Sequence, residues 1–305
     1  MYKINGSEQR KAQNSKRKTK AFNFALSAGC FALTLIFSAC SPQRFFYYPN
    51  RTLYVDPDKV GLHPELVQYP SLDGKLLTAL YFKTDQRPKG TIVHFHGNFG
   101  NVSNHFPLSL FLLKYGFDVL AFDYEGYGAS EGRPTPKNLV EDGIASVRYA
   151  QAHLRSPSAG VAIFGQSVGG AAAIVVAAEE PLVKAALIEA AFSGHAAMAR
   201  AALKRNILTW PLYPFAPLFM NRSYDPIRFV GRISPRPVFF IHGDQDRIVP
   251  VQMSKELYER AIEPKKLWIV PGAGHLEPHH LAGVEYEKAV ADFFTTALST
   301  GTKPN

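Results

Sequence analysis

The sequence around Ser167 is of a kind in which a serine can act as a nucleophile. It is the central residue of a Gly-x-Ser-x-Gly pattern that Gly165 and Gly169 complete. The pattern alone is weak evidence, but an apolar run at 160–163 precedes it and an alanine-rich run at 171–178 follows it. The sequence therefore predicts a strand that turns sharply into a helix, with the serine at the turn. Such a turn forces the serine into a sparsely allowed backbone conformation, and the two glycines permit close backbone approach.

A serine hydroxyl needs a base that removes its proton and a third group that orients this base. His275 is the candidate base, on a glycine-containing loop after the apolar run 267–270. Asp244 and Asp246 are the candidate orienting acids, on the loop after the apolar run 238–241. Both loops follow predicted strands, at the sheet edge where α/β proteins build their sites.

Short apolar runs alternate with helical stretches, which predicts an α/β fold with a mostly parallel sheet and helices on both faces. The predicted strands are 76–82, 91–95, 118–122, 161–164, 185–188, 238–241 and 267–270. The predicted helices lie near 104–115, 136–153, 168–180, 251–261 and 280–298. Residues 41–74 are expected to form an irregular or edge-strand lead-in, and residues 75–300 one α/β domain.

One long segment interrupts this alternation. Residues 192–233 contain no predicted strand but many aromatic and proline residues. A loop of this length in a compact domain is usually functional or disordered, and its aromatic content argues against disorder. It either packs over the sheet as surface structure or forms a small lid that lines an apolar substrate cleft.

Five separate motifs resemble those of a known family. They are the turn around Ser167 and four loop sequences at 94–98, 123–132, 242–246 and 272–275. Through them, residues 75–298 resemble the α/β-hydrolase superfamily, in its branch of small-lidded, membrane-associated serine hydrolases. The resemblance implies the α/β-hydrolase fold. Glu125 departs from the family pattern, which often has Arg there, but it lies outside the catalytic positions.

The resemblance also implies a catalytic triad. Ser167 matches the family's nucleophile, His275 its general base and acid, and Asp246 the residue that orients the imidazole. Asp244 competes for the last role, and the family motif favours Asp246. The order Ser, Asp, His along the chain is the order of this fold.

Two backbone N–H groups are implied as the oxyanion hole, which stabilises the negative oxygen of the tetrahedral intermediate. One belongs to Val168, at the start of the helix after the nucleophile. The other belongs to Asn98, with Phe99 as the alternative. His96, just before these residues, is expected to fix the loop rather than to act in catalysis.

The first 40 residues have the pattern of a targeting segment. A basic stretch precedes the uncharged residues 21–39, and Ser38, Ala39 and Cys40 resemble the end of a bacterial lipobox, although Phe37 stands where an aliphatic residue is usual. The resemblance implies lipidation of Cys40 and a membrane-anchored protein of the bacterial cell envelope that faces the periplasm. An uncleaved segment of about 19 residues would instead anchor the chain as a membrane-spanning helix. A plain cleaved signal would leave a soluble product.

Most of the positive charge belongs to this leader. The formal net charge is +9, whereas the 27 basic and 24 acidic residues after position 40 leave +3. The folded part therefore lacks the basic excess expected of a nucleic-acid-binding surface. Cys30 and Cys40 both lie in the leader, so the folded part has no internal disulfide, cysteine-bound zinc or thiol nucleophile.

No cofactor and no metal are expected. A Gly-x-Gly-x-x-Gly motif does not follow the first strand, so a dinucleotide site has no support. Glu277, His279 and His280 lie near His275, but neighbouring residues at a helix start point to different faces and no zinc signature appears. His195 and His242 are expected to be structural.

These observations predict a membrane-attached serine hydrolase that cleaves an ester or thioester of a small or lipid-like acyl substrate through an acyl-enzyme. A serine peptidase of the same fold is the first alternative. A non-catalytic, membrane-tethered binding protein that kept the fold is the second.

Overall fold

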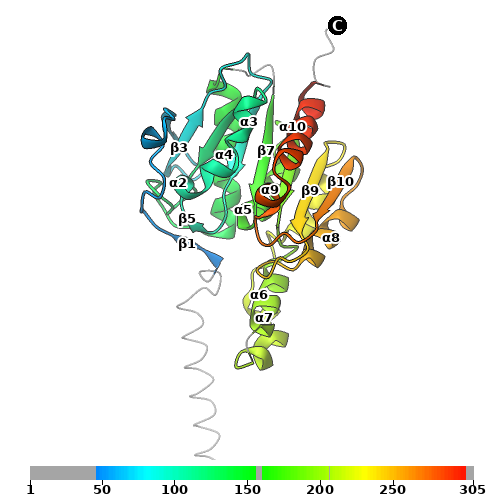
Figure 1. Ribbon diagram of the computed structural model, residues 1–305. Coiled ribbons are helices and arrows are strands. Elements are labelled where there is room, and N and C mark those ends of the chain that lie inside the picture. Colours follow the sequence, from blue (N-terminus) through cyan, green and yellow to red (C-terminus); the bar gives the residue numbers. More distant parts are fainter. Residues whose placement is uncertain (1–45, 156–159, 206, 300–305) are drawn as a thin grey trace, which may run out of the picture. The chain divides into compact units, whose positions relative to one another are not determined.

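The computed structural model describes residues 46–155, 160–205 and 207–299 (Figure 1). The predictions for the leader, including Cys40, fall outside the described residues. Among the helices that the structure describes, none has both the length and the apolar character to cross a bilayer.

A sheet of eight strands forms the centre of the fold, in the order β10-β9-β8-β7-β4-β6-β3-β2. All neighbouring strands are parallel except at one edge, where β3 runs antiparallel to both β6 and β2. The predicted mostly parallel sheet is confirmed. The strands are β2 (Glu65–Pro70), β3 (Leu76–Phe82), β4 (Thr91–Phe95), β6 (Asp118–Phe122), β7 (Val161–Gln166), β8 (Val183–Glu189), β9 (Val238–Gly243) and β10 (Lys265–Val270).

The lead-in contributes to this sheet and to a smaller one. Its strand β2 pairs with β3 at the edge of the main sheet. A second pair joins β1 (Tyr48–Pro49) in parallel to β5 (Phe99–Gly100), so the lead-in also touches the loop after β4. That loop carries Asn98.

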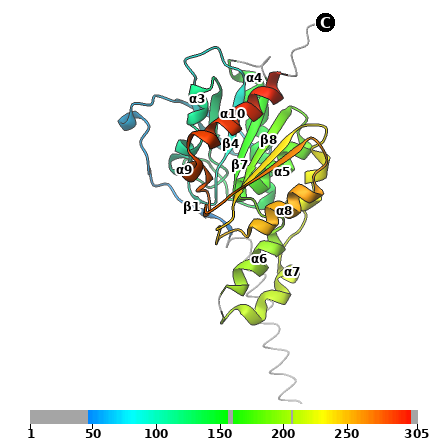
Figure 2. The same ribbon diagram turned by 45° about the vertical axis from the view of Figure 1, so that its right-hand side comes forward.

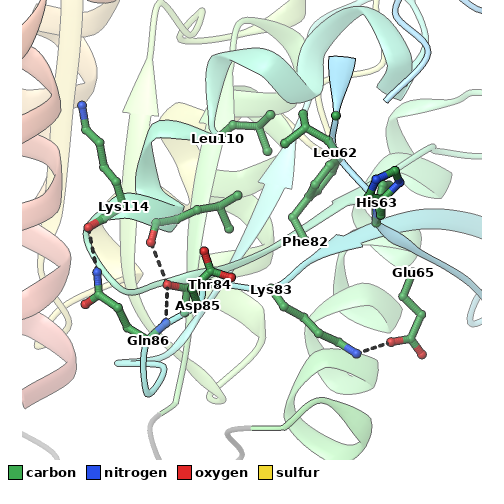
Figure 3. A pocket seen from close by; sticks show the side chains of 13 residues that line it. Leu62, His63, Glu65, Phe82, Lys83, Thr84, Asp85, Gln86, Leu110 and Lys114 are labelled. Atoms are coloured by element: carbon green, nitrogen blue, oxygen red, sulfur yellow. Dashed lines mark hydrogen bonds and ion pairs between the residues drawn. The ribbon is translucent and has the colours of Figure 1, made fainter. Parts of the chain in front are cut away.

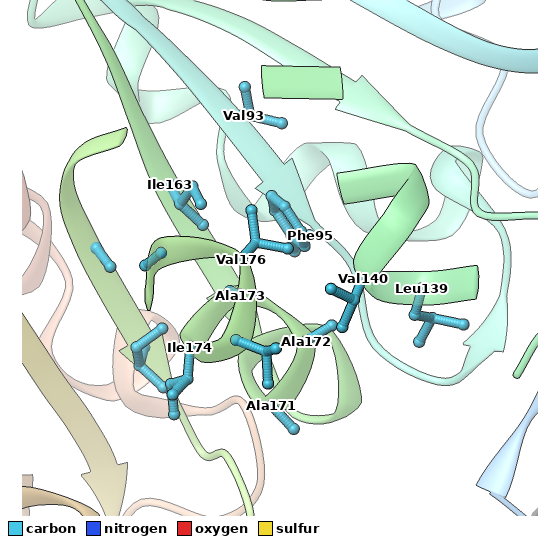
Figure 4. Packing of buried hydrophobic residues seen from close by; sticks show 14 of the residues in the cluster. Val93, Phe95, Leu139, Val140, Ile163, Ala171, Ala172, Ala173, Ile174 and Val176 are labelled. Carbon is cyan, nitrogen blue, oxygen red and sulfur yellow. The ribbon is translucent and has the colours of Figure 1, made fainter. Parts of the chain in front are cut away.

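Helices cover both faces of the sheet (Figures 1 and 2). One face carries α4 (Pro136–His153), α5 (Val168–Glu179) and α8 (Val251–Arg260), and the other carries α3 (Phe111–Lys114) and α10 (Val284–Ser299). Successive strand residues point to opposite faces, so Val93 of β4 joins the first core and Ile92 the second. Figure 4 shows Val93 and Ile163 of the strands in one cluster with Ala173 and Val176 of the alanine-rich α5. Both faces of the central strands are therefore buried, which explains their continuous apolar runs.

Two predicted helices are broken in the structure. The stretch 104–115 forms α2 (Val102–His105), a 3₁₀ turn at Phe106–Leu108 and α3, because Pro107 has no backbone N–H to continue an α-helix. The stretch 280–298 is divided into α9 (Pro278–Ala282) and α10 by Gly283, whose φ is 52°. A positive φ ends a right-handed helix, and glycine adopts it readily.

The segment 192–233 connects β8 to β9 and contains no strand among its described residues. It forms α6 (His195–Lys204), a 3₁₀ helix at Trp210–Phe215, α7 (Ala216–Phe219) and 3₁₀ turns at Pro226–Arg228 and Val230–Arg232. Figures 1 and 2 both show α6 and α7 extending beyond the edge of the sheet. We call residues 192–233 the lid segment.

Candidate active site

Ser167 lies between β7 and α5 with φ 55° and ψ −119°, a conformation that L-residues rarely adopt. Holding it there costs about 1–3 kcal/mol, which neighbouring contacts must offset. The N–H of Ser167 donates to the carbonyl of Glu189 at 2.9 Å, and this bond ties the turn to β8. The side chain is buried but not sealed, with 8% of the residue exposed.

Two glycines allow this turn to pack closely. A Cβ at Gly165 would lie 2.6 Å from the Cβ of Ala173 in α5. A Cβ at Gly169 would lie 2.3 Å from the carbonyl oxygens of both Phe95 and His96. The start of α5 therefore packs directly against the end of β4 and its following loop, which carries Asn98.

The structure brings Ser167, His275 and Asp246 together from three separate loops. His275 Nε2 lies 3.1 Å from Ser167 Oγ, and His275 Nδ1 lies 2.7 Å from Asp246 Oδ2. The three loops follow β7, β9 and β10, whose carboxyl ends meet at one edge of the parallel sheet. The arrangement can pass a proton from the hydroxyl to the imidazole while the carboxylate holds the ring.

Asp246 is held by four donors. His242 Nε2 lies 3.0 Å from the same Oδ2 that His275 contacts, and the N–H groups of Ile248 and Val249 donate to Oδ1 at 2.7 and 2.9 Å. Burial alone would raise the pKa of Asp246, but the hydrogen bonds from His242 and His275 outweigh it and hold the pKa well below its ordinary value. Asp246 is therefore an anion throughout the neutral range.

Asp244 occupies a different position. Its Oδ1 accepts a hydrogen bond from the N–H of Gly272 at 2.7 Å. It thus ties together the two loops that carry Asp246 and His275, and Asp246 is the acid in contact with the imidazole.

Val168 and Asn98 are the residues whose N–H groups were predicted to form the oxyanion hole. Val168 is the first residue of α5, and Asn98 lies between β4 and β5. Among the hydrogen bonds of the described residues, neither N–H donates to another protein group. The Asn98 carbonyl accepts from the N–H of Tyr48 and the hydroxyl of Tyr127, so its loop is held in place.

The histidines that were expected to be structural are buried with defined partners. His96 Nδ1 donates to the carbonyl of Gly97 at 2.7 Å. His195 contacts Asp225 at 3.0 Å. His242 Nδ1 lies 2.6 Å from Ser254 Oγ, and its other nitrogen reaches Asp246. Sequence reasoning missed this link between His242 and the triad acid, although the position of His242 four residues before Asp246 could have suggested it.

Sequence reasoning also missed a buried polar chain beneath the nucleophile. Gln166 Nε2 donates to Glu189 at 2.7 Å, and the Tyr286 hydroxyl donates to the same carboxylate oxygen at 3.1 Å. The other side of Gln166 contacts His94 Nε2 at 3.0 Å, and Ser109 Oγ contacts His94 Nδ1 at 3.0 Å. Polar residues inside otherwise apolar strands were the available indication of this chain.

A small apolar cavity of about 10 Å³ touches the residue after the nucleophile. It has room for about one water molecule. Val168 lines it together with Phe192, His195 and Tyr224 from the lid segment.

Larger hollows lie elsewhere. One of about 700 Å³ is lined by β2, β3 and the α3 region, where Figure 3 shows Lys83 paired with Glu65. Another of about 770 Å³ lies against α10 and includes Lys266 and Phe293. No triad residue lines either hollow.

Glu277 and His279, which lie near His275 in the sequence, have different hydrogen-bond partners. Glu277 accepts from the N–H of Gly274 at 2.8 Å, whereas His279 contacts Glu287 at 3.2 Å. Among the described residues, no three His, Cys, Asp or Glu side chains gather as metal ligands would.

Comparison with known proteins places this site in context. The sequence model of the family described as "Serine aminopeptidase, S33" matches residues 86–230. The uncharacterized protein YfhR of Escherichia coli K12 is 30% identical over 263 residues, which cover 84% of this chain and 88% of YfhR. Among solved structures, the Pyrococcus furiosus esterase Pf2001 aligns with a TM-score of 0.68 and 23% identity, over 83% of this chain and 98% of the esterase.

A second solved structure, Est1E of Butyrivibrio proteoclasticus with bound ferulic acid, aligns with a TM-score of 0.59 and 23% identity, over 76% of this chain and all of Est1E. These two structures show the fold, and the match to YfhR over most of both chains shows the family. The chain has the α/β-hydrolase fold and belongs to the same family as YfhR, and its residues 86–230 match the family model described as serine aminopeptidase S33.

Proposed function

We propose that the protein is a membrane-attached serine hydrolase that cleaves carboxylic ester or thioester bonds of small or lipid-like acyl substrates through an acyl-enzyme. The observation that carries the proposal is the continuous relay from Ser167 through His275 to Asp246, with distances of 3.1 and 2.7 Å. These distances allow proton transfer during nucleophilic attack.

The proposed reaction has two halves. His275 Nε2 takes the proton of Ser167 as Oγ attacks the acyl carbon, and the proton then passes to the leaving alcohol or thiol as its bond to the acyl carbon breaks. In the second half, His275 removes a proton from water as its oxygen attacks the acyl carbon; the bond from this carbon to Ser167 Oγ then breaks, Oγ takes the proton back from His275, and the acid is released. The N–H groups of Val168 and Asn98 would stabilise the negative oxygen in both halves, each contributing roughly 10²–10³ in turnover.

The test is the replacement Ser167→Ala, measured with p-nitrophenyl esters of graded acyl length and with a fluorophosphonate probe that labels activated serines. Turnover should fall by up to roughly 10⁶, as when a triad nucleophile is removed, and labelling should disappear. The fold should be retained, because only one oxygen is removed. Wild-type turnover or labelling in the variant would refute the role of Ser167, and a wild-type chain that neither reacts with the probe nor cleaves any acyl substrate would favour a binding protein.

A peptidase is the second candidate, since the matching family model is described as a serine aminopeptidase. The two activities share the acyl-enzyme route, so they differ in the leaving group that the site accepts. Aminoacyl anilides measured beside the esters distinguish them. A higher kcat/KM for the anilides would favour the peptidase.

Membrane attachment is proposed from the leader, through lipidation of Cys40 or an uncleaved helix. If Cys40 is lipidated, Cys40→Ser should abolish incorporation of a labelled fatty acid into the chain. Unchanged labelling would refute lipidation at this position. Loss of labelling together with release of the variant from membranes would show that the lipid is the anchor.

A further inference from the structure

The lid segment exposes an unusual number of large apolar side chains. The exposed fraction is 86% for Ile207, 54% for Trp210, 55% for Leu212, 53% for Phe215 and 76% for Leu218. These residues fall within twelve positions of the chain. Single exposed apolar residues are normal on a protein surface, but an exposed apolar surface of several large side chains is typical of a site that contacts a membrane, another protein or a ligand.

The first 33 residues of the lid segment, from Phe192 to Tyr224, carry formal charge of one sign. Between Phe192 and Tyr224 there are four basic residues and no acidic residue, although basic and acidic residues are nearly balanced in the chain after position 40. Arg200 and Lys204 are both exposed on α6. An apolar surface flanked by cations is complementary to a bilayer that carries anionic headgroups.

The aromatic residues of the lid segment are also typical of a membrane interface. Trp210 packs against Tyr213 with ring centroids 6.0 Å apart, and the Lys204 ammonium lies 4.5 Å from the centre of the Tyr213 ring. Trp and Tyr concentrate at membrane interfaces because their rings are apolar and their N–H or O–H groups can still meet water. A cation beside these rings can remain at the level of the headgroups.

The first described residue contacts the beginning of the lid segment. Phe46, the first described residue, packs against Phe192 and His195 with ring centroids 6.0 and 5.7 Å apart. It follows Cys40 by six positions, and six residues reach at most about 20 Å when fully extended. A lipid on Cys40 would therefore keep the base of the lid segment close to the bilayer. This argument depends on the proposed lipidation of Cys40, whereas the arguments from the exposed apolar side chains and from the basic residues do not.

We infer that the apolar surface of the lid segment, formed by Ile207, Trp210, Leu212, Phe215 and Leu218 and flanked by Arg200 and Lys204, docks on the surface of a bilayer that contains anionic phospholipid. The lid segment begins after β8, at the same sheet edge as Ser167 and His275. Docking would place this edge against the bilayer, so the acyl substrates would come from the membrane.

Tryptophan fluorescence can test whether the lid segment itself contacts the bilayer, independently of whether the whole chain binds to vesicles. The chain has two tryptophans, Trp210 in the lid and Trp268 in β10, so Trp268→Phe leaves Trp210 as the only reporter. The full chain carrying this change is reconstituted into vesicles of phosphatidylglycerol and phosphatidylcholine with brominated acyl chains. Trp210 emission should shift to shorter wavelength and be quenched by bromine.

The matched variant Trp210→Phe keeps Trp268, which packs against Tyr286, and its emission should not be quenched by bromine. In the Trp268→Phe background, Ile207→Ser with Leu218→Ser should abolish quenching of Trp210. Ile262→Ser is the control, because Ile262 is 59% exposed outside the lid segment and should have no effect. The replacements Arg200→Gln and Lys204→Gln should each lower the affinity of the lid segment for these vesicles about fivefold.

Unquenched Trp210 in chains that float with the vesicles would overturn the inference. Equal quenching in vesicles without phosphatidylglycerol would overturn its anionic part. A blue shift without vesicles that grows with protein concentration would show that a second copy covers the lid. Fluorophosphonate labelling of Ser167 is measured separately, so failure of docking and failure of the proposed catalysis are distinguishable.

Discussion

At the scale of single residues, Asp246 is the centre of the site's electrostatics. Its Oδ2 contacts both His275 and His242, and its Oδ1 accepts two backbone N–H groups. The carboxylate is therefore fixed in position before any substrate arrives. A fixed carboxylate at Nδ1 keeps His275 in the tautomer whose Nε2 can accept the proton of Ser167.

The role of Asp246 can be tested by comparing its replacement with that of Asp244 on the same loop. Asp246→Asn should lower kcat on a p-nitrophenyl ester by roughly 10⁴, because an amide can donate to the imidazole and stabilise the wrong tautomer. Asp244→Asn is the matched control on the same loop and should have a much smaller effect, since Asp244 contacts the N–H of Gly272 and not His275. Equal losses in the two variants would contradict the assignment of Asp246.

At the scale of elements, the nucleophile turn depends on strands and helices that are distant in sequence. Glu189 at the end of β8 accepts the N–H of Ser167 through its backbone and the side chains of Gln166 and Tyr286 through its carboxylate. These contacts join β7, β8 and α10 beneath the site. Burial raises the pKa of Glu189, and among the described residues its second carboxylate oxygen has no hydrogen-bond partner.

Two replacements at Glu189 separate the acceptor from the charge. Glu189→Leu should lower the free energy of unfolding by about 1–3 kcal/mol for each buried donor left unpaired, the Gln166 amide and the Tyr286 hydroxyl. Glu189→Gln keeps an acceptor of the same shape and should stay close to wild type. Urea denaturation followed by circular dichroism gives both values. Equal destabilisation by Leu and Gln would show that the hydrogen bonds to the carboxylate are not what matters.

At the scale of the whole molecule, Asp142 makes stability depend on pH. It lies in α4 with no exposed surface, and its carboxylate accepts from the Ser71 hydroxyl at 2.6 Å and the Glu125 N–H at 2.8 Å. Burial raises the pKa of Asp142 from 3.8 to about 7, and the nearby charges of Glu125 and Asp73 act in the same direction. The folded protein therefore binds a proton here that the unfolded chain releases between about pH 4 and 7.

Because the folded state holds this extra proton, the contribution of Asp142 to stability is most favourable below about pH 4 and falls as the pH rises through about 7. The amide introduced by Asp142→Asn cannot titrate, so the stability of this variant relative to wild type should increase over this range, by up to about 4 kcal/mol for a shift of about three pKa units. Urea unfolding of both proteins at several pH values measures the difference. A constant difference would contradict the raised pKa.

The sequence by itself determined the fold class and most of the elements that position the site. Strands at 76–82, 91–95 and 118–122 and the helix at 136–153 have the same bounds in the structure. Their patterns are local, since apolar runs are bounded by glycine, proline or polar residues. The turn at Ser167 was also predictable, because the residues that it needs are adjacent in sequence.

Only the tertiary structure decided which side chains meet. The contacts of Glu189 with Gln166 and Tyr286 depend on strand order and register, which bring together residues 23 and 97 positions apart. The exposure of the lid's apolar residues was likewise invisible in the sequence, because the same residues could have packed over the sheet. Neighbours along a chain leave a local pattern, whereas burial and contact between distant segments arise only when the whole core has assembled.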